Sequence, residues 1–245
     1  MAIGLTEEHQ ALAASVRGLA ERHITATVVR DEVDAPRREG RPEFWGRLAE
    51  QGLLGLHVPE EFGGQGFGLV EQAVVAEELG RALAPGPYLP TVLAAAAVAA
   101  FAGDATKAEV LPSLADGSRT AAVALRGDLT VTDGGTLQGT ATTVLGAPLA
   151  DLFVLPLGED RWALVDAADV TVTEAESLDL TRPVGDVTVD GVTFTEFAGP
   201  VGDLAVVLFG AEACGVAGRV LDDAVAYAKI REQFGRPIGQ FQGVK

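Results

Sequence analysis

The stretch Arg231-Glu-Gln-Phe-Gly-Arg-Pro-Ile-Gly-Gln-Phe-Gln242 places two arginines, three glutamines and two aromatic rings within twelve residues. A helical pattern precedes it from about Asp203, and Gly235 and Pro237 are signals that end a helix. A guanidinium fork beside an amide and an aromatic face suits a diphosphate joined to a flat ring system. An arginine at a helix C-terminus is also a common partner of the helix dipole alone. The residues by themselves therefore leave both roles of Arg231 open.

Outward from this stretch, the chain divides into three zones of different periodicity. Residues 5–116 have helical spacing and are rich in Ala, Leu, Glu and Arg, whereas residues 119–200 contain short runs typical of β-strands. Helical spacing returns at about residue 203. Strands and helices do not alternate in the middle zone, which disfavours a parallel Rossmann sheet. We predict an α+β protein with a helical domain at 1–117, an antiparallel, barrel-like β domain at 118–200, and the start of a helical bundle at 201–245.

The first zone predicts five helices. Thr6 followed by two glutamates is typical of a helix start, and Val16 and Leu19 lie on the apolar stripe of that helix, which ends at His23. Four more helices are expected at 42–51, 69–83, 91–102 and 104–115. Another helix is expected to begin at Gln240. Its six residues are too few for an isolated helix, so we expect either a longer natural chain or a second chain that completes the fold.

The middle zone predicts strands at 151–157, 161–165, 169–173 and 186–195. Gly158, Glu159 and Asp160 fit a hairpin connection between the first two strands. Asp190-Gly191 lies within the last run, where it indicates either a hairpin turn or a bend in one long strand.

The bulk composition excludes several classes of protein. The 245 residues are 48% hydrophobic and 22% charged, which allows a sizeable core, and the net charge of -17 makes nucleic acid an improbable partner. The single cysteine, Cys214, rules out an internal disulfide and a zinc site built on cysteine pairs. The longest apolar run, Val92 to Ala102, is about half of the roughly 20 residues of a membrane span. With no secretory signal in the sequence, we expect a cytoplasmic protein without a membrane span.

Other tempting motifs have plainer interpretations. The glycine-rich segment at 63–68 lacks the full dinucleotide fingerprint and follows no strand, so we interpret it as a turn-rich connector. His9, His23 and His57 have no metal-ligand spacing, and no metal site is expected. Glu77 and Glu78 point in different directions on one helix and are interpreted as solvated charges.

Taken together, several stretches resemble the acyl-CoA dehydrogenase family over essentially the whole chain. The segments that carry the resemblance are residues 5–12, 55–66, 77–81, 137–139, 150–155, 179–182 and 215–242. The resemblance implies a helical domain, a β domain and a C-terminal four-helix bundle that continues beyond residue 245. It also implies α,β-dehydrogenation of an acyl-CoA thioester by FAD, with a glutamate as base and an electron-transfer flavoprotein as electron acceptor.

The same resemblance implies the site residues. Arg231 and Gln242 match the family's FAD contacts, with Gln233 and Phe234 in support. In the family these residues reach the diphosphate and adenine half of an FAD held by a neighbouring subunit, which implies a dimer or tetramer of like or unlike chains.

Elsewhere the sequence departs from the family's pattern. The flavin-contacting motif of the β domain is replaced by Ala124 to Asp128, and the family's Trp-Ile-Thr or Trp-Ile-Ser falls on Thr143-Val-Leu145. Leu145 offers no hydroxyl, which leaves backbone donors at that position. One subfamily carries its catalytic glutamate where this chain has Ala205, and the more common location lies beyond Lys245. The nearby Glu212 is not at a matching position, so the catalytic residue stays unassigned.

Three hypotheses follow from this pattern. The first is an FAD-dependent acyl-CoA dehydrogenase whose base lies outside these 245 residues. The second is a non-catalytic partner subunit that completes a neighbour's FAD site, which the altered middle motif favours. The third is a scaffold that has lost flavin altogether, and the intact 231–242 stretch argues against it.

Overall fold

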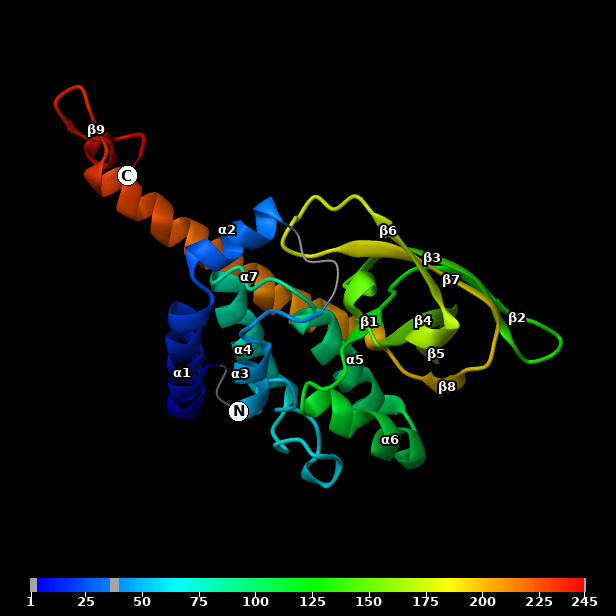
Figure 1. The fold of residues 1–245 in the computed structure, drawn as a ribbon. Helices are drawn as coiled ribbons and strands as arrows, with labels where there is room; N and C mark the ends of the chain where they lie inside the picture. The colour runs from blue at the N-terminus through cyan, green and yellow to red at the C-terminus, as the bar shows by residue number, and fades with distance from the viewer. Residues whose placement is uncertain (1–3, 36–39, 245) are drawn as a thin grey trace.

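Within residues 4–35 and 40–244, which the computed structural model describes, a group of helices packs against a two-sheet β part, and a long helix runs from the β part past the helices (Figure 1). The helices are α1 (Glu7–His23), α2 (Ala26–Asp34), α3 (Trp45–Glu50), α4 (Leu69–Arg81), α5 (Tyr88–Phe101), α6 (Asp104–Ala115) and α7 (Val201–Ile230), with short 3-10 turns η1 (Glu60–Phe62), η2 (Ala147–Leu149), η3 (Ala167–Asp169) and η4 (Ile238–Gln240). The strands are β1 (Ala121–Val123), β2 (Asp128–Val131), β3 (Leu137–Leu145), β4 (Leu152–Gly158), β5 (Arg161–Asp166), β6 (Thr171–Ala175), β7 (Val184–Val192), β8 (Thr195–Ala198), β9 (Glu232–Gln233) and β10 (Arg236–Pro237). The fold class predicted from the sequence is confirmed.

The start of α1 follows directly from its sequence. The Thr6 side chain accepts a hydrogen bond from the His9 backbone at 3.3 Å, and His9 Nδ1 accepts one from the Thr6 backbone. Because Nδ1 is an acceptor, the other ring nitrogen carries the proton and donates to Glu71 Oε1 at 2.9 Å. This hydrogen bond lowers the pKa of Glu71 and ties α1 to α4. Val16 and Leu19 are fully buried, as the predicted apolar stripe requires.

Other helix predictions need correction at particular points. The helix α2 was missed, because its nine residues are mostly polar or β-branched and only Glu32 among them is buried. Glu78 on α4 is buried and paired with Arg17 of α1, which contradicts its interpretation as a solvated charge. Arg17 donates to both carboxylate oxygens, and this pairing raises the pKa of Arg17. Residues 241–244 form a bend and turns, so the helix expected from Gln240 is not formed within the described residues.

Two four-stranded sheets make up the β part. One has the order β1-β4-β5-β8 and the other β2-β3-β7-β6; the β1–β4 pair is parallel and the remaining pairs are antiparallel. Gly158, Glu159 and Asp160 form the predicted β4–β5 hairpin, and all three have positive φ. At Asp190-Gly191 the bend is confirmed and the hairpin is wrong: β7 continues to Val192, and β8 then joins the other sheet.

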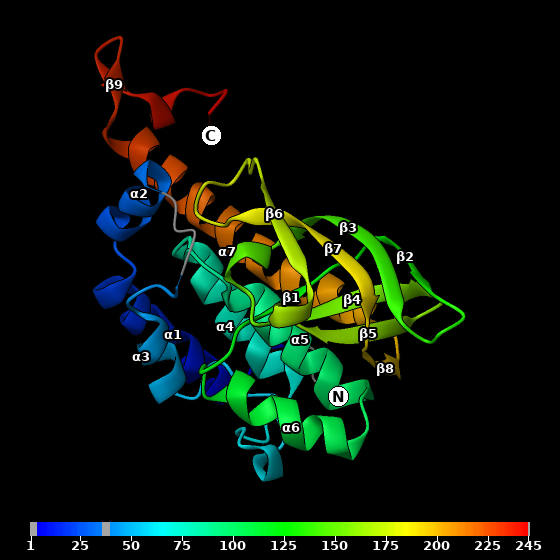
Figure 2. The ribbon, with the colours of Figure 1, turned by 45° about the vertical axis from the view of Figure 1, so that its right-hand side comes forward.

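The first sheet lies between the helices and the second sheet, and β4 shows this most clearly. Leu152 and Val154 belong to the core shared with the helices, whereas Phe153 and Leu155 belong to the core between the sheets. A strand covered on both faces has a continuous apolar run instead of an alternating one. Figures 1 and 2 show α5 beside this sheet, and every residue of α5 from Tyr88 to Val98 is buried. An all-round apolar helix is stable only in such surroundings.

The helix α7 is long and apolar enough to cross a membrane by length and composition, and it is the only described helix that meets both tests. The core helix of a soluble protein meets the tests of length and composition equally well. The first half of α7 packs in the helical core through residues such as Val201 and Leu208. The sequence prediction that the chain has no membrane span stays a prediction.

A buried polar network joins three segments of the helical part. The ring of His57 donates from Nδ1 to Gln72 Oε1 at 2.8 Å, and the Gln72 amide donates to the Leu53 carbonyl and to the Tyr88 hydroxyl. His57 Nε2 is buried and has no partner. Burial therefore lowers the pKa of His57, because protonation would place a charge where nothing accepts the proton. Burial likewise raises the pKa of Tyr88.

The lowered pKa of His57 predicts a loss of stability on acidification. Below its ordinary pKa of about 6.5, His57 binds a proton in the unfolded chain but not in the folded one, so the free energy of unfolding falls with falling pH. The contribution is full above about pH 6.5 and declines by at most about 1.4 kcal/mol per pH unit below it. Urea unfolding from pH 7.5 down to pH 5.5 measures this slope. His57→Gln, which cannot titrate, should flatten it, and an unchanged slope in that variant contradicts the assignment.

Candidate functional site

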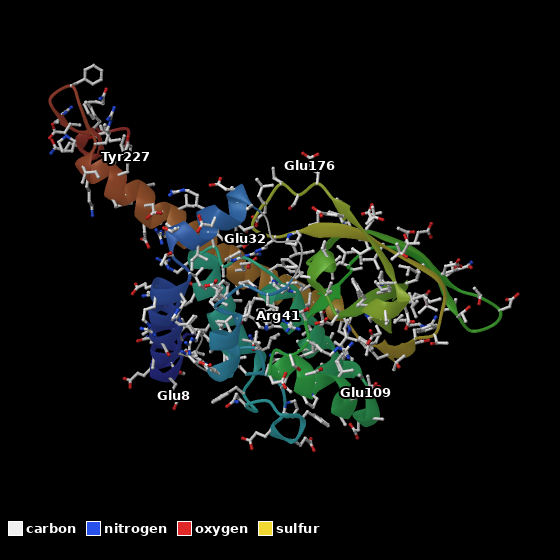
Figure 3. The ribbon with its side chains drawn as sticks, viewed as in Figure 1. Glu8, Glu32, Arg41, Glu109, Glu176 and Tyr227 are labelled. Carbon is white, nitrogen blue, oxygen red and sulfur yellow. The ribbon has the colours of Figure 1, made fainter. Side chains whose placement is uncertain are left out.

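The helix α7 carries the predicted site at its far end. Its buried residues are Val201, Ala205, Leu208 and Gly215, and none of the described residues from 216 to 244 is buried. The second half projects beyond the rest of the chain, and Tyr227 marks this projecting part (Figure 3). Apolar side chains remain exposed along it, among them Leu221 and Ile230. Apolar side chains gain stability when a partner covers them.

Close packing against α4 sets the direction in which α7 runs. A Cβ atom at Gly215 would lie 1.9 Å from the Glu77 carbonyl oxygen, and one at Gly80 would lie 2.5 Å from the Glu212 carbonyl oxygen. Glycine at both positions lets the two helix backbones touch where any side chain would force them apart. Further out, Arg81 of α4 pairs with Asp222 of α7.

A buried ion pair fixes α7 to the β part. The Arg182 guanidinium, which follows β6, donates to Glu212 of α7 with N–O distances of 2.8 and 2.7 Å. Their side chains are 12% and 13% exposed, and Arg182 also reaches the carbonyl of Ala84 after α4. Three parts of the chain therefore meet at Arg182. Glu212 is fully engaged as an anchor, in line with leaving it out of the catalytic candidates.

We expect Arg182→Met to destabilise the chain by about 3 kcal/mol, because it leaves the Glu212 carboxylate buried without a partner. The double variant Arg182→Met, Glu212→Met should recover most of this loss, since no uncompensated charge remains. Urea unfolding of the two variants and the parent chain measures both effects. A double variant as unstable as the single one would show that packing, and not the ion pair, holds the segments together.

Beyond α7 the chain forms a two-stranded arm, defined here as residues 231–244. Arg231 caps the helix, and its N–H donates to the Tyr227 carbonyl. The strands β9 and β10 are joined by a two-residue turn, Phe234-Gly235, in which both residues have positive φ. This geometry usually takes Asn-Gly or Gly-Gly. A phenylalanine with φ of 53° is uncommon.

All four predicted FAD-contacting residues lie on this arm. Arg231 is exposed, and no ion pair to it is found within the described residues. The Phe234 ring is 93% exposed, although burial is the usual state of such a ring. Gln233 donates its amide to the Glu232 carbonyl at 2.8 Å, and Gln242 is exposed. A free guanidinium, two amides and a bare aromatic face fit the chemistry of an FAD diphosphate and its adenine ring.

Two further residues of the arm make side-chain contacts that were not predicted from the sequence. The Arg236 guanidinium lies over the Phe241 ring at 4.1 Å from its centroid, and Phe241 meets Phe234 edge to face at 6.3 Å. The sequence signal was the repeated order of aromatic and cationic residues within 231–242. This signal does not predict the contact, because the residues meet only through the β9–β10 hairpin. A hairpin of two residues on each strand is too short to give an alternating apolar pattern in the sequence.

The middle part shows what the departures from the family motif mean in three dimensions. At Thr143 the backbone has positive φ in a bulge of β3, and its N–H already donates to Asp186 Oδ1 at 2.8 Å. Val144 is buried, and Leu145 is half-buried. The Thr143 N–H is therefore occupied, and the backbone donors expected at Leu145 stay a prediction. Ala124 is buried, while Leu125 and Arg126 are exposed.

Ala205 stands where one subfamily has its base, and it is only 2% exposed. The helix core of this chain surrounds it. Within the described residues, no group of three or more His, Cys, Asp or Glu side chains could hold a metal ion.

The packing around Ala205 is testable with two adjacent substitutions. Ala205→Glu should lower the free energy of unfolding by at least about 3 kcal/mol, because it forces a carboxylate into an apolar core. Val206→Glu is the matched control, since Val206 is 74% exposed and a charge there stays in water. Thermal unfolding of both variants and of the parent chain measures the difference in stability. Equal tolerance of the two would mean that space for a base exists at position 205.

Comparison with known proteins agrees with this architecture. Residues 6–118 match the profile "Acyl-CoA dehydrogenase, N-terminal domain", and residues 203–245 match "Acyl-CoA dehydrogenase, C-terminal domain". The chain is 35% identical to acyl-CoA dehydrogenase IpdE2 of Mycolicibacterium smegmatis, across 98% of this chain and 71% of that protein. It is 36% identical to acyl-CoA dehydrogenase FadE34 of Mycobacterium tuberculosis, but it spans 35% of the length of that protein.

Solved structures give the same result. A variant of the Tcur3481-Tcur3483 steroid ACAD superposes with a TM-score of 0.88 at 33% identity, covering 97% of this chain and 71% of that one. The ChsE4-ChsE5 complex of Mycobacterium tuberculosis gives a TM-score of 0.87 at 34% identity, covering 99% and 72%. The chain belongs to the acyl-CoA dehydrogenase family. The predicted class, an acyl-CoA dehydrogenase-type subunit, is thereby confirmed.

Proposed function

We propose that this chain is a subunit of an FAD-dependent acyl-CoA dehydrogenase and that its arm contacts the FAD held by a neighbouring subunit. The observation that carries the proposal is the position of Arg231 and Phe234. Both are exposed at the end of a helix that projects away from the rest of the chain (Figure 1). Side chains placed there meet another molecule more readily than this chain's own sheets.

Each residue of the arm has a distinct role in this proposal. Arg231 neutralises the diphosphate through its planar fork, and Gln233 and Gln242 supply neutral donors beside it. The face of Phe234 packs against a flat ring. When bound, FAD supplies the acceptor for the hydride that leaves the β-carbon of an acyl-CoA thioester. The chain's own contribution is to hold and orient the cofactor.

We extend the proposal to the partners that membership of the family implies. The substrate is an acyl-CoA, an electron-transfer flavoprotein takes up the electrons, and the assembly is a dimer or tetramer in the cytoplasm. The exposed apolar side chains on the second half of α7 support an assembly, because they gain stability when covered. Two of the similar solved structures are named for two components each, Tcur3481-Tcur3483 and ChsE4-ChsE5, which favours unlike chains.

Arg231→Ala tests the FAD contact. The assembly should be purified through a tag on this chain and its FAD affinity measured by equilibrium dialysis with absorbance in the flavin band. We expect affinity to fall about 10- to 100-fold, because a charge-assisted hydrogen bond to a phosphate contributes about 1.5–3 kcal/mol. Arg231→Lys keeps the charge but loses the planar fork, so its FAD affinity should lie between that of the parent assembly and that of Arg231→Ala. Unchanged FAD affinity in Arg231→Ala would refute the proposal.

A second candidate function is that of a non-catalytic partner chain. Two observations favour it: Ala205 is buried among this chain's own side chains, and Leu145 brings no hydroxyl to the flavin position. In this case the chain completes a neighbour's FAD site and leaves the chemistry to that neighbour.

Flavin absorbance separates the candidates. The chain is produced alone and together with a candidate partner chain, and bound flavin is recorded after gel filtration. Flavin on the chain alone supports an enzyme with its own cofactor, whereas flavin only in the mixture supports the partner role. An absence of flavin from both samples would support a scaffold that has lost the cofactor.

A further inference from the structure

We infer that α2 is a movable strap, which closes a groove against the second half of α7 and pairs Arg30 with Asp223. The groove has a volume of about 550 Å³, and its walls come from α1, α2, the end of α4 and α7. Two views show α2 beside the projecting half of α7 (Figures 1 and 2). The inference concerns these helices alone, so it goes beyond the proposed cofactor contact and does not depend on it.

The packing that holds α2 in place is sparse. Of its nine residues only Glu32 is buried. The groove lies on one side of α2, and a second hollow of about 240 Å³, which Val28 and Asp31 help to line, lies on the other. A helix with few buried side chains and open space on both sides belongs to the elements that move most readily in a folded chain.

The connection between α1 and α2 supplies the hinge. Ile24 ends α1 and is buried, and its N–H donates to the Ala20 carbonyl at 2.7 Å. Thr25 begins α2, and its side chain accepts a hydrogen bond from the Val28 N–H. Each helix therefore keeps its own end, and a rotation of α2 is taken up by the backbone between them.

One face of α2 is suited to close the groove. The residues of α2 that line it have the spacing of a single helical face, and they are Ala26, Val29, Arg30 and Val33. Leu83, which follows α4 and is 46% exposed, lines the same groove. Closure removes these apolar side chains from water, which stabilises the closed form.

Most of the charged side chains around the groove are already engaged. The engaged groups are Arg17 with Glu78, Arg81 with Asp222, and Glu21, which interacts electrostatically with Arg17. Arg30 differs from them, because neither a hydrogen bond nor an ion pair to its side chain is found within the described residues. Its charge is therefore available to an acid on another wall of the groove.

The acid that suits Arg30 is Asp223 of α7. Asp223 pairs with Arg219 of its own helix at 2.8 Å, and both side chains are more than half exposed. An exposed pair within one helix contributes little to stability, so Asp223 can share its carboxylate with Arg30. Asp223 lies midway between Gly215 and Arg231. Closure thus braces the projecting half of α7 at its middle and halves the length that has no support.

Distances between two spin labels test the inference on the 245-residue chain. Cys214, the single native cysteine, is replaced by Ser, and labels are attached at Thr27→Cys on α2 and Ala224→Cys on α7, both exposed positions. We expect two distance populations. The shorter one, the closed form, should grow about 2-fold when the ionic strength falls from about 0.5 M to about 0.05 M, because salt screens exposed charges. Labels at Gln10→Cys and Ala224→Cys, which leave out α2, should give one distance throughout.

Substitutions identify the pair that closes the strap. Arg30→Ala and Asp223→Ala should each reduce the shorter-distance population about 3-fold, and the double variant should lose no more than either single one, because all three remove the same interaction. Asp31→Ala is the matched control. Asp31 is exposed on the same helix but lines the hollow on the other side, so its removal should leave the populations unchanged.

Three results would overturn the inference. One distance between Thr27→Cys and Ala224→Cys in every sample would show that α2 is fixed. Equal effects of Asp31→Ala and Arg30→Ala would show that the loss of any charge on α2 matters, and not the loss of this pair. Additive losses in the double variant would show that Arg30 and Asp223 act separately.

Discussion

The crossing of α4 and α7 is the contact on which the rest of the structure depends. Two glycines, Gly80 and Gly215, let the backbones approach so closely that a single methyl group would collide with a carbonyl oxygen. Arg182 and Glu212 then fix the same helix to the β part. The first half of α7 thus has one orientation relative to the helices and the sheets. Everything beyond Gly215, including the arm, takes its direction from this anchored half.

The anchored first half of α7 is buried, whereas its second half and the arm are exposed. Ala205 is packed into the core, and α5 is covered on all sides, so the space between these helices is already filled. The exposed groups suited to an anionic, aromatic cofactor are gathered at the opposite end of α7. This arrangement is consistent with the proposed contact between the arm and a neighbouring subunit.

Features that depend on neighbouring residues could be predicted from the sequence, whereas contacts between distant residues could not. The start of α1 at Thr6 and the turn at Gly158 to Asp160 rest on neighbouring residues, and both were predictable. The strand β1 was not, because three alanine- and valine-rich residues become a strand only by pairing with β4, some thirty positions later. The burial of Glu78 depended on Arg17 in another helix, and the Arg236 stack depended on a two-residue turn. Patterns in sequence report periodicity and caps, but they do not report partners that meet only after folding.

The length of α7 has a mechanical consequence. From Gly215 to Arg231 the helix extends over 16 positions, and at about 1.5 Å per residue this places Arg231 about 24 Å beyond the crossing. Over such a lever, a tilt of about 5° at the crossing moves the guanidinium by about 2 Å. A hydrogen bond tolerates only a few tenths of an ångström. Substitutions at Gly80 or Gly215 would thus misalign a tip about 24 Å away, because the length of the helix magnifies a small change of angle at the crossing.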